Sequence, residues 1–160
     1  MARRLLIPVL AALVVLLGVA AVWTGARLRE AQARADDRRA ALDAAGAHAI
    51  SLISLNHATV DADIRRILAT STGAAKAEYA AGSAKLRQTT LANKVVQTGV
   101  LRAAGLESLA GGTAKALVVA DVDIRWEGSR AAPQKRFYRW SMEVTKVRGV
   151  WLVSKAVQVL

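Results

Sequence analysis

Two histidines and a few carboxylates are the residues of this chain that could act as acids, bases or metal ligands. The sequence of 160 residues contains no Cys, and its only histidines are His48 and His57. The absence of Cys excludes a thiol nucleophile, a Cys-ligated zinc site and a disulfide scaffold. Two histidines exclude a His-rich metal site. We therefore predict neither a metal nor a cofactor.

The remaining candidates for catalysis are Asp121, Asp123 and Tyr79. The two aspartates alternate with apolar residues and precede Arg125, a pattern typical of the solvated face of a strand. Tyr79 could donate a hydrogen bond in an isomerase-like pocket, but the pattern gives it no buried carboxylate as a partner. We predict no catalytic residues. The alternative, a tethered isomerase or dehydratase domain, requires Asp121 or Asp123 to be buried beside Tyr79.

The N-terminal segment predicts a membrane anchor. Residues 5–23 carry no charge and, as a helix, would span about 28 Å, close to the hydrocarbon core of a bilayer. A cleaved signal peptide is the competing interpretation, but the apolar run is longer than the usual signal-peptide core, and no clear small-residue cleavage site follows. We assign residues 1–4 to a short tail and residues 5–23 to a transmembrane anchor. Flanking charges leave the topology open, because Arg residues lie on both sides.

A long polar helix is expected after the anchor. Residues 24–57 lack Pro, and apolar residues recur at steps of three and four, as in Leu28, Ala31, Ala35, Leu42, Ala45, Ala49 and Leu52. Such a stripe is compatible with self-association as a coiled coil. The stripe is Ala-rich and shorter than four strict heptads, which favours a connecting helix whose end packs on the following domain. We call this segment the stalk and place the α+β domain at residues 58–160.

The domain begins with short helices and continues as strands. Asp61 and Asp63 fall in the first turn of one helix, and the break at residues 70–73 precedes a second helix that runs to about Asn93. From Val95 the hydrophobic period becomes two. We predict strands at 95–101, with an extension to about Leu109, and at 114–126, 136–147 and 150–159.

The last two strands form a hairpin with a predictable register. Arg148-Gly149 suits a two-residue type I′ turn, which pairs Val147 with Val150. The same register places Val144 opposite Val153 and Trp140 opposite Val157. It also brings Lys146 opposite Trp151, where a cation–π contact is expected. Lys155 opposite Met142 is the one unfavourable pair.

The predicted fold is α+β, with short helices on one face of a curved antiparallel sheet. This layout resembles the nuclear-transport-factor-2-like superfold, which hosts enzymes, binding domains and assembly modules. Trp126, Trp140 and Met142 would lie inside such a cone. They could pack the core or line a lipid-binding cavity.

Positive charge is spread along the whole chain, with 23 Lys and Arg against 12 Asp and Glu and a net charge of +11. A basic surface can attract nucleic acid, acidic lipid or an acidic protein. The chain has no Arg-rich recognition helix and no aromatic pair of the kind that stacks single-stranded bases. The composition therefore favours a membrane and protein partners over nucleic acid.

Several short motifs resemble those of the actinobacterial Mce-associated membrane proteins. They are the early anchor and Ala/Arg-rich stalk, the run Asp63–Leu68 followed by Ser71-Thr72-Gly73 and Tyr79, the pair Gly99-Val100, the strand 116–122, and the ending 142–147 with Gly149–Val153. Ala74 and Ala75 depart from the acidic or aromatic pair expected there.

The resemblance implies an accessory subunit that stabilises or assembles a Mce-type lipid import complex. It implies a single-pass protein of the cytoplasmic membrane whose C-terminal domain lies on the extracytoplasmic side, with Mce transporter subunits as partners. The resemblance gives no catalytic residues that could be assigned to positions of this sequence. The candidate partner contacts are Asp63, Arg65, Arg66, Thr72, Gly73 and Tyr79. The alternative is a bitopic assembly factor of a type IV secretion or conjugation machine, which has the same anchor and a similar domain.

Overall fold

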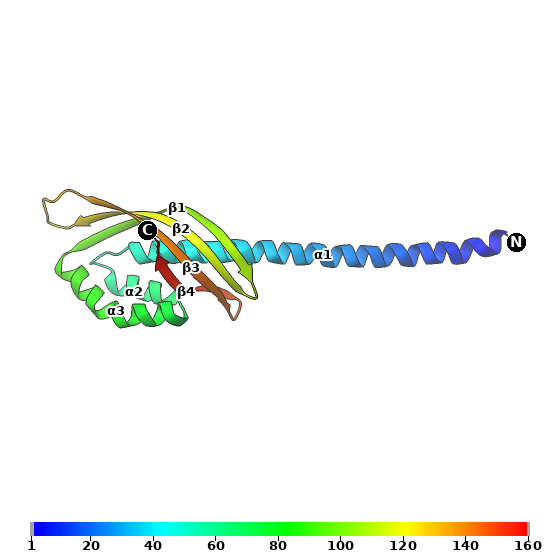
Figure 1. The fold of residues 1–160 in the computed structure, drawn as a ribbon, viewed down its shortest axis with the longest axis horizontal. Helices are drawn as coiled ribbons and strands as arrows, with labels where there is room; N and C mark the ends of the chain where they lie inside the picture. The colour runs from blue at the N-terminus through cyan, green and yellow to red at the C-terminus, as the bar shows by residue number, and fades with distance from the viewer. Residues whose placement is uncertain (1, 160) are drawn as a thin grey trace. The chain divides into compact units, whose positions relative to one another are not determined.

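A computed structural model describes residues 2–159 of the chain and the side chains from Leu16 onward. Three helices precede four strands (Figure 1). The elements are α1 (Ala2–Ile53), α2 (Val60–Ala69), α3 (Gly73–Ala92), β1 (Val95–Ala110), β2 (Thr113–Trp126), β3 (Gln134–Val147) and β4 (Val150–Gln158). The predicted α+β class is confirmed, and β1 includes the extension suggested by the sequence.

The chain forms two compact units, one ending at Asp37 and one covering Arg38–Leu160. The sequence placed the start of the domain at residue 58. The difference arises because the last turns of α1 bury their apolar stripe with the sheet. Ala41, Ala45 and Ala49 are fully buried in the same core as the strands. Only small side chains recur on this stripe, so the helix backbone can lie close to the sheet.

The first unit consists of the earlier part of α1. In it Leu28, Ala31 and Ala35 are exposed, and the guanidinium of Arg27 lies 4.6 Å from the ring centroid of Trp23. Among the side chains that the structure describes, no helix contains a stretch long and apolar enough to cross a membrane. Residues 5–15 of the predicted anchor are not among the residues whose side chains the structure describes.

The four strands form one antiparallel sheet in the order β1-β2-β3-β4. Even-numbered residues of β2 from Ala114 to Ile124 are buried, whereas the odd-numbered residues face away from the core. The part of α1 from Arg38 onward, together with α2 and α3, lies on the buried side of the curved sheet (Figure 1). We call the opposite face the outer face. Two register shifts interrupt the pairing of β1 with β2 and leave Arg102 and Glu107 without a direct partner in the ladder.

The hairpin prediction is confirmed at its turn and wrong at its far end. Val147 pairs with Val150 and Val144 with Val153, and the ammonium of Lys146 lies 5.7 Å from the ring centroid of Trp151. A bulge follows, so Trp140 pairs with Gln158 instead of Val157. The bulge moves Lys155 from the apolar Met142 to Glu143, which removes the unfavourable pair.

Candidate functional site

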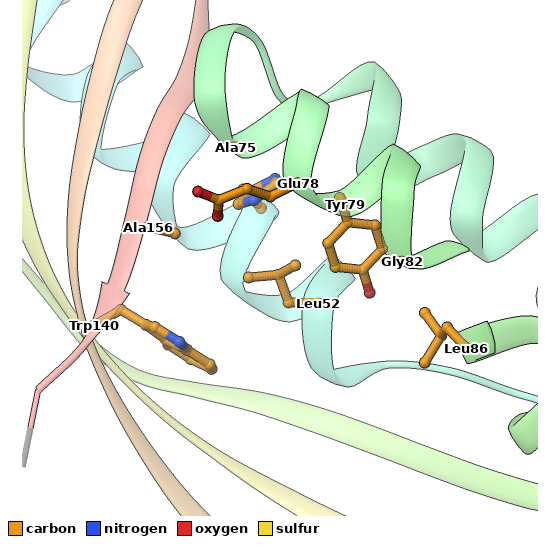
Figure 2. A pocket seen from close by; sticks show the side chains of 9 residues that line it. Leu52, Ala75, Glu78, Tyr79, Gly82, Leu86, Trp140 and Ala156 are labelled. Carbon is orange, nitrogen blue, oxygen red and sulfur yellow. The ribbon is translucent and has the colours of Figure 1, made fainter. Parts of the chain in front are cut away.

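The described part of the domain contains a cavity of about 380 Å³. It lies between the end of α1, one side of α3, and strands β3 and β4. Its lining is His48, Leu52, Ala75, Glu78, Tyr79, Gly82, Leu86, Trp140 and Ala156. Figure 2 shows Tyr79 and Leu86 from α3 on one side and Trp140 from β3 on the other. The mixture of apolar walls with a few polar groups is typical of small-molecule sites.

His48 is the most deeply buried polar group of the cavity, with only 2% of its surface exposed. Its Nδ1 atom lies 2.8 Å from the hydroxyl oxygen of Thr70. Burial lowers the pKa of His48 to about 4, because the charged imidazolium would lose its hydration. The imidazole is therefore neutral at pH 7.

The aromatic residues of the cavity come from opposite elements. Burial raises the pKa of Tyr79 to about 12, so its hydroxyl stays protonated and can donate a hydrogen bond. Trp140 stacks on Tyr138 with ring centroids 5.0 Å apart, which holds the indole in place. Of the three residues expected inside the cone, Trp140 lines the cavity, Met142 is fully buried in the core, and Trp126 packs against that core.

Asp63 is a structural residue that organises the start of α2. One of its carboxylate oxygens accepts hydrogen bonds from the backbone N–H of Asn56 (2.9 Å) and the hydroxyl of Thr59 (3.0 Å). The other accepts one from Arg66 (2.9 Å). Only 4% of Asp63 is exposed, so it is not available to a partner in this state. Arg66 also reaches the carbonyl of Ser54, while Arg65 is exposed.

Thr72 and Gly73 join the helices to the edge of the sheet. The backbone N–H of Thr72 donates to the carbonyl of Val153 (2.8 Å), and the Val153 N–H donates to the Thr70 carbonyl (3.1 Å). Gly73 has φ +52°, the left-handed region that favours glycine, and lies beside Ser154. The six predicted partner-contact residues therefore do not form one surface, and Tyr79 belongs to the cavity.

Asp121 and Asp123 lie on β2 with the odd-numbered residues of the outer face, away from Tyr79 and the cavity. Arg102 donates to Asp121 at 2.6 Å, and Lys135 lies 4.0 Å from Asp123. The condition for the isomerase-like alternative is thus not met in this structure. No group of three potential metal ligands occurs among the described residues.

The outer face also carries exposed apolar side chains. Phe137 is 72% exposed and is paired across the ladder with Asp121. Val100, Leu117 and Val157 lie on the same face and are each more than 40% exposed. We call these four residues the outer apolar patch. Asp121 separates Val100 from Phe137 across the strands, and Ser141 separates Leu117 from Val157. Exposed apolar side chains on a solvated sheet mark a candidate interaction surface.

Sequence reasoning missed His48 and Glu78 as cavity residues. His48 was read as part of a solvated stalk, and Glu78 belongs to a helix with a weak apolar stripe. The available signal was the Ala41-Ala45-Ala49 stripe, which predicts burial of the neighbouring helix positions.

Comparison with solved structures finds the same fold in other proteins. The periplasmic domain of DotI matches with a TM-score of 0.60 and 17% identity, covering 74% of this chain and 91% of that chain. An IcmL-like type IV secretion system protein from Legionella pneumophila gives 0.58 and 15%, covering 74% and 91%. VirB8 of Agrobacterium tumefaciens gives 0.62 and 9%, covering 78% and 92%. These likenesses establish the fold alone.

A search of curated proteins finds no significant match. A family model, by contrast, matches residues 5–159, nearly the whole sequence. The chain therefore belongs to the family described as "Uncharacterized protein Rv1363c/MT1408-like".

Proposed function

We propose that this chain is a non-catalytic assembly subunit of a multiprotein complex in the cell envelope, of the type IV secretion or conjugation kind. The observation that carries the proposal is the fold. Three solved neighbours, one a periplasmic domain and one a type IV secretion system protein by description, share it over about three quarters of this chain. The extracytoplasmic side is accordingly the proposed location of the C-terminal domain.

The chemistry of the cavity supports a role without catalysis. Glu78 is the one carboxylate among the lining residues, and it is exposed. His48 is a weak base at neutral pH because its pKa is about 4, whereas efficient general bases have a pKa near the working pH. The second acid or base that a proton-transfer reaction needs is not supplied by Asp121 or Asp123, which lie on the other side of the sheet.

The outer apolar patch is the proposed contact with a partner protein. Asp121, which is paired with Arg102, lies between Val100 and Phe137, and Lys115 is paired with Glu107 on the same face. Protein–protein interfaces combine apolar contacts with hydrogen-bonding polar groups. Since aromatic residues often dominate binding energy, we expect Phe137 to be the most sensitive position.

A Mce-type lipid import complex is the second candidate. It rests on the sequence motifs described above, and the match to a mycobacterial family is consistent with it. In both candidates the protein would assemble a membrane complex. They differ in the identity of the machine that co-purifies with it.

Affinity purification from native membranes tests the proposal. The tagged full-length chain would be crosslinked mildly, purified and examined by mass spectrometry beside two variants, Phe137→Glu and Val150→Glu. Val150 is a suitable control because it is 58% exposed but lies at the hairpin turn. We expect secretion or conjugation components with the wild type and Val150→Glu, and their loss with Phe137→Glu.

Other outcomes decide between the candidates. Recovery of Mce subunits with their permease or ATPase would replace the first candidate by the second. Absence of any specific partner would overturn the assembly role altogether. Equal recovery with Phe137→Glu would leave the assembly role standing and remove the outer apolar patch as its surface. Protease protection of the C-terminal domain in right-side-out vesicles would contradict the proposed location.

A further inference from the structure

The cavity contains a hydrogen-bond acceptor whose orientation is fixed by its neighbours. The hydroxyl oxygen of Thr70 lies 3.0 Å from the carbonyl oxygen of Ile67 and 3.1 Å from that of Arg66. If the Thr70 proton pointed to His48 instead, the lone pairs of the Thr70 oxygen would face both carbonyl oxygens at these distances with no proton between them, which is repulsive. The Thr70 proton is therefore directed to one of the carbonyls. The Thr70 oxygen must then accept its bond from Nδ1–H of His48. This assigns the proton of the neutral ring to Nδ1.

The other ring nitrogen, Nε2, consequently carries a lone pair. No described side-chain nitrogen or oxygen is both buried and without a partner, and the structure gives Nε2 no hydrogen bond to a described residue. Nε2 therefore keeps access to open space, and the open space that His48 lines is the cavity. The cavity thus offers a fixed acceptor to a ligand that can donate.

The polar groups at the mouth restrict the ligand further. The Glu78 carboxylate is another acceptor and would repel an anion. Most of the remaining lining is apolar and includes the flat indole of Trp140 and the side chains of Leu52 and Leu86 (Figure 2). Apolar walls of this kind favour an aromatic or aliphatic body.

We propose that the cavity binds a neutral apolar molecule bearing a hydroxyl group, with the hydroxyl donating to Nε2 of His48 and the apolar body packed against Leu52, Leu86 and Trp140. Carboxylates of the same shape are rejected, because their oxygens would face the lone pair of His48 and the charge of Glu78. Ethers of the same shape are rejected because they cannot donate. The site is a ligand site additional to the assembly role and independent of it.

The test uses three probes of nearly equal size, namely 4-phenylbutan-1-ol, its methyl ether and 4-phenylbutanoate. Each is titrated calorimetrically into the full-length chain in phosphatidylcholine nanodiscs, and empty discs are used to subtract partition into lipid. We expect saturable binding of the alcohol at one site per chain. The ether and the carboxylate should bind about tenfold more weakly or worse, the difference expected when a buried acceptor is left unpaired.

Gly82→Leu tests the location without removing a structural contact. A Cβ atom at Gly82 would meet nothing within 4 Å, so the new side chain enters the open cavity without a clash. Leu also favours the helix more than Gly does. The matched control is Ala84→Leu, at an exposed position of α3 that does not line the cavity. We expect Gly82→Leu to abolish alcohol binding and Ala84→Leu to leave it unchanged.

Each possible result has a defined meaning. No saturable binding of the alcohol, or binding that survives Gly82→Leu, would overturn the site. Equal binding of all three probes that is lost in Gly82→Leu would overturn the role of the hydroxyl and of His48. Because none of these measurements involves a protein partner, their outcome is independent of whether the assembly role is correct.

Discussion

The contact between α1 and β1 can be tested at Gly99, where the backbone of the strand approaches the helix. A Cβ atom placed there would lie 2.5 Å from Cγ1 and 2.8 Å from Cδ1 of Ile53, which is 5% exposed in the core. Both distances are shorter than packed carbon atoms allow. Gly99→Ala must therefore displace Ile53, the last residue of α1.

The cost of this displacement can be worked out from its components. Overpacking of a core by one methyl group typically costs about 1–3 kcal/mol. Replacing Gly by Ala stabilises the folded state by about 0.4–1 kcal/mol, because it lowers the conformational entropy of the unfolded chain. We expect a net loss of about 1–2 kcal/mol in the free energy of unfolding. Gly105→Ala on the same strand has nothing within 4 Å of its new Cβ, so it should be neutral or slightly stabilising.

Urea unfolding of the full-length variants, followed by circular dichroism, measures both effects. Ile53→Ala provides the second arm of a double-mutant cycle, because it removes both clashing atoms. We expect Gly99→Ala to cost about 1 kcal/mol less in that background than in the wild type. Additive effects, or equal stability of Gly99→Ala and Gly105→Ala, would refute the close packing of α1 on β1.

Further predictions concern the buried polar groups and one turn. Asp63→Ala should lower the free energy of unfolding by about 1–2 kcal/mol, since the part-buried donors of Asn56 and Thr59 lose their acceptor. Thermal unfolding checks this, and a loss below about 0.5 kcal/mol would contradict it. The pKa of His48 is about 4 in the folded chain and 6.5 in the unfolded chain. As the pH falls, the unfolded chain therefore binds a proton at His48 before the folded chain does. Stability should be constant above about pH 6.5 and fall by about 3 kcal/mol towards pH 4. His48→Gln should remove that part of the slope, and an unchanged slope would exclude His48 as its source. Gly73→Ala should cost about 1 kcal/mol because of φ +52°, whereas a stabilising effect in the same assay would show that the turn relaxes.

Local patterns were sufficient to predict most of the domain. Alternating apolar residues predicted β2 and the hairpin, and the break at residues 70–73 separated α2 from α3, as observed. What they could not predict was how far the stalk belongs to the domain. Ala41, Ala45 and Ala49 are weak hydrophobic signals, and their burial depends on a sheet formed more than 50 residues later in the chain.

The cavity was predicted only in part for a similar reason. Trp140 was expected inside the cone, and it lines the cavity. His48 was missed, because the Ala stripe beside it is only a weak hydrophobic signal for burial. The bulge in β4 was not predicted either. It pairs Lys155 with Glu143 instead of Met142, and this gain depends on the two assembled strands and not on either strand alone.

The two register shifts of β1 have a consequence for aggregation. Beyond its contacts with residues 55–57, β1 forms an outer edge of the sheet, and a regular edge strand is a template for pairing with other chains. The two residues without a partner in the ladder, Arg102 and Glu107, are both charged. Each forms an ion pair with a residue of β2, Arg102 with Asp121 and Glu107 with Lys115. Distortion combined with charge discourages a foreign strand from docking there. Deleting Arg102 and Glu107 would make the pairing of this edge regular, and we expect the domain then to associate more readily through edge-to-edge strand pairing.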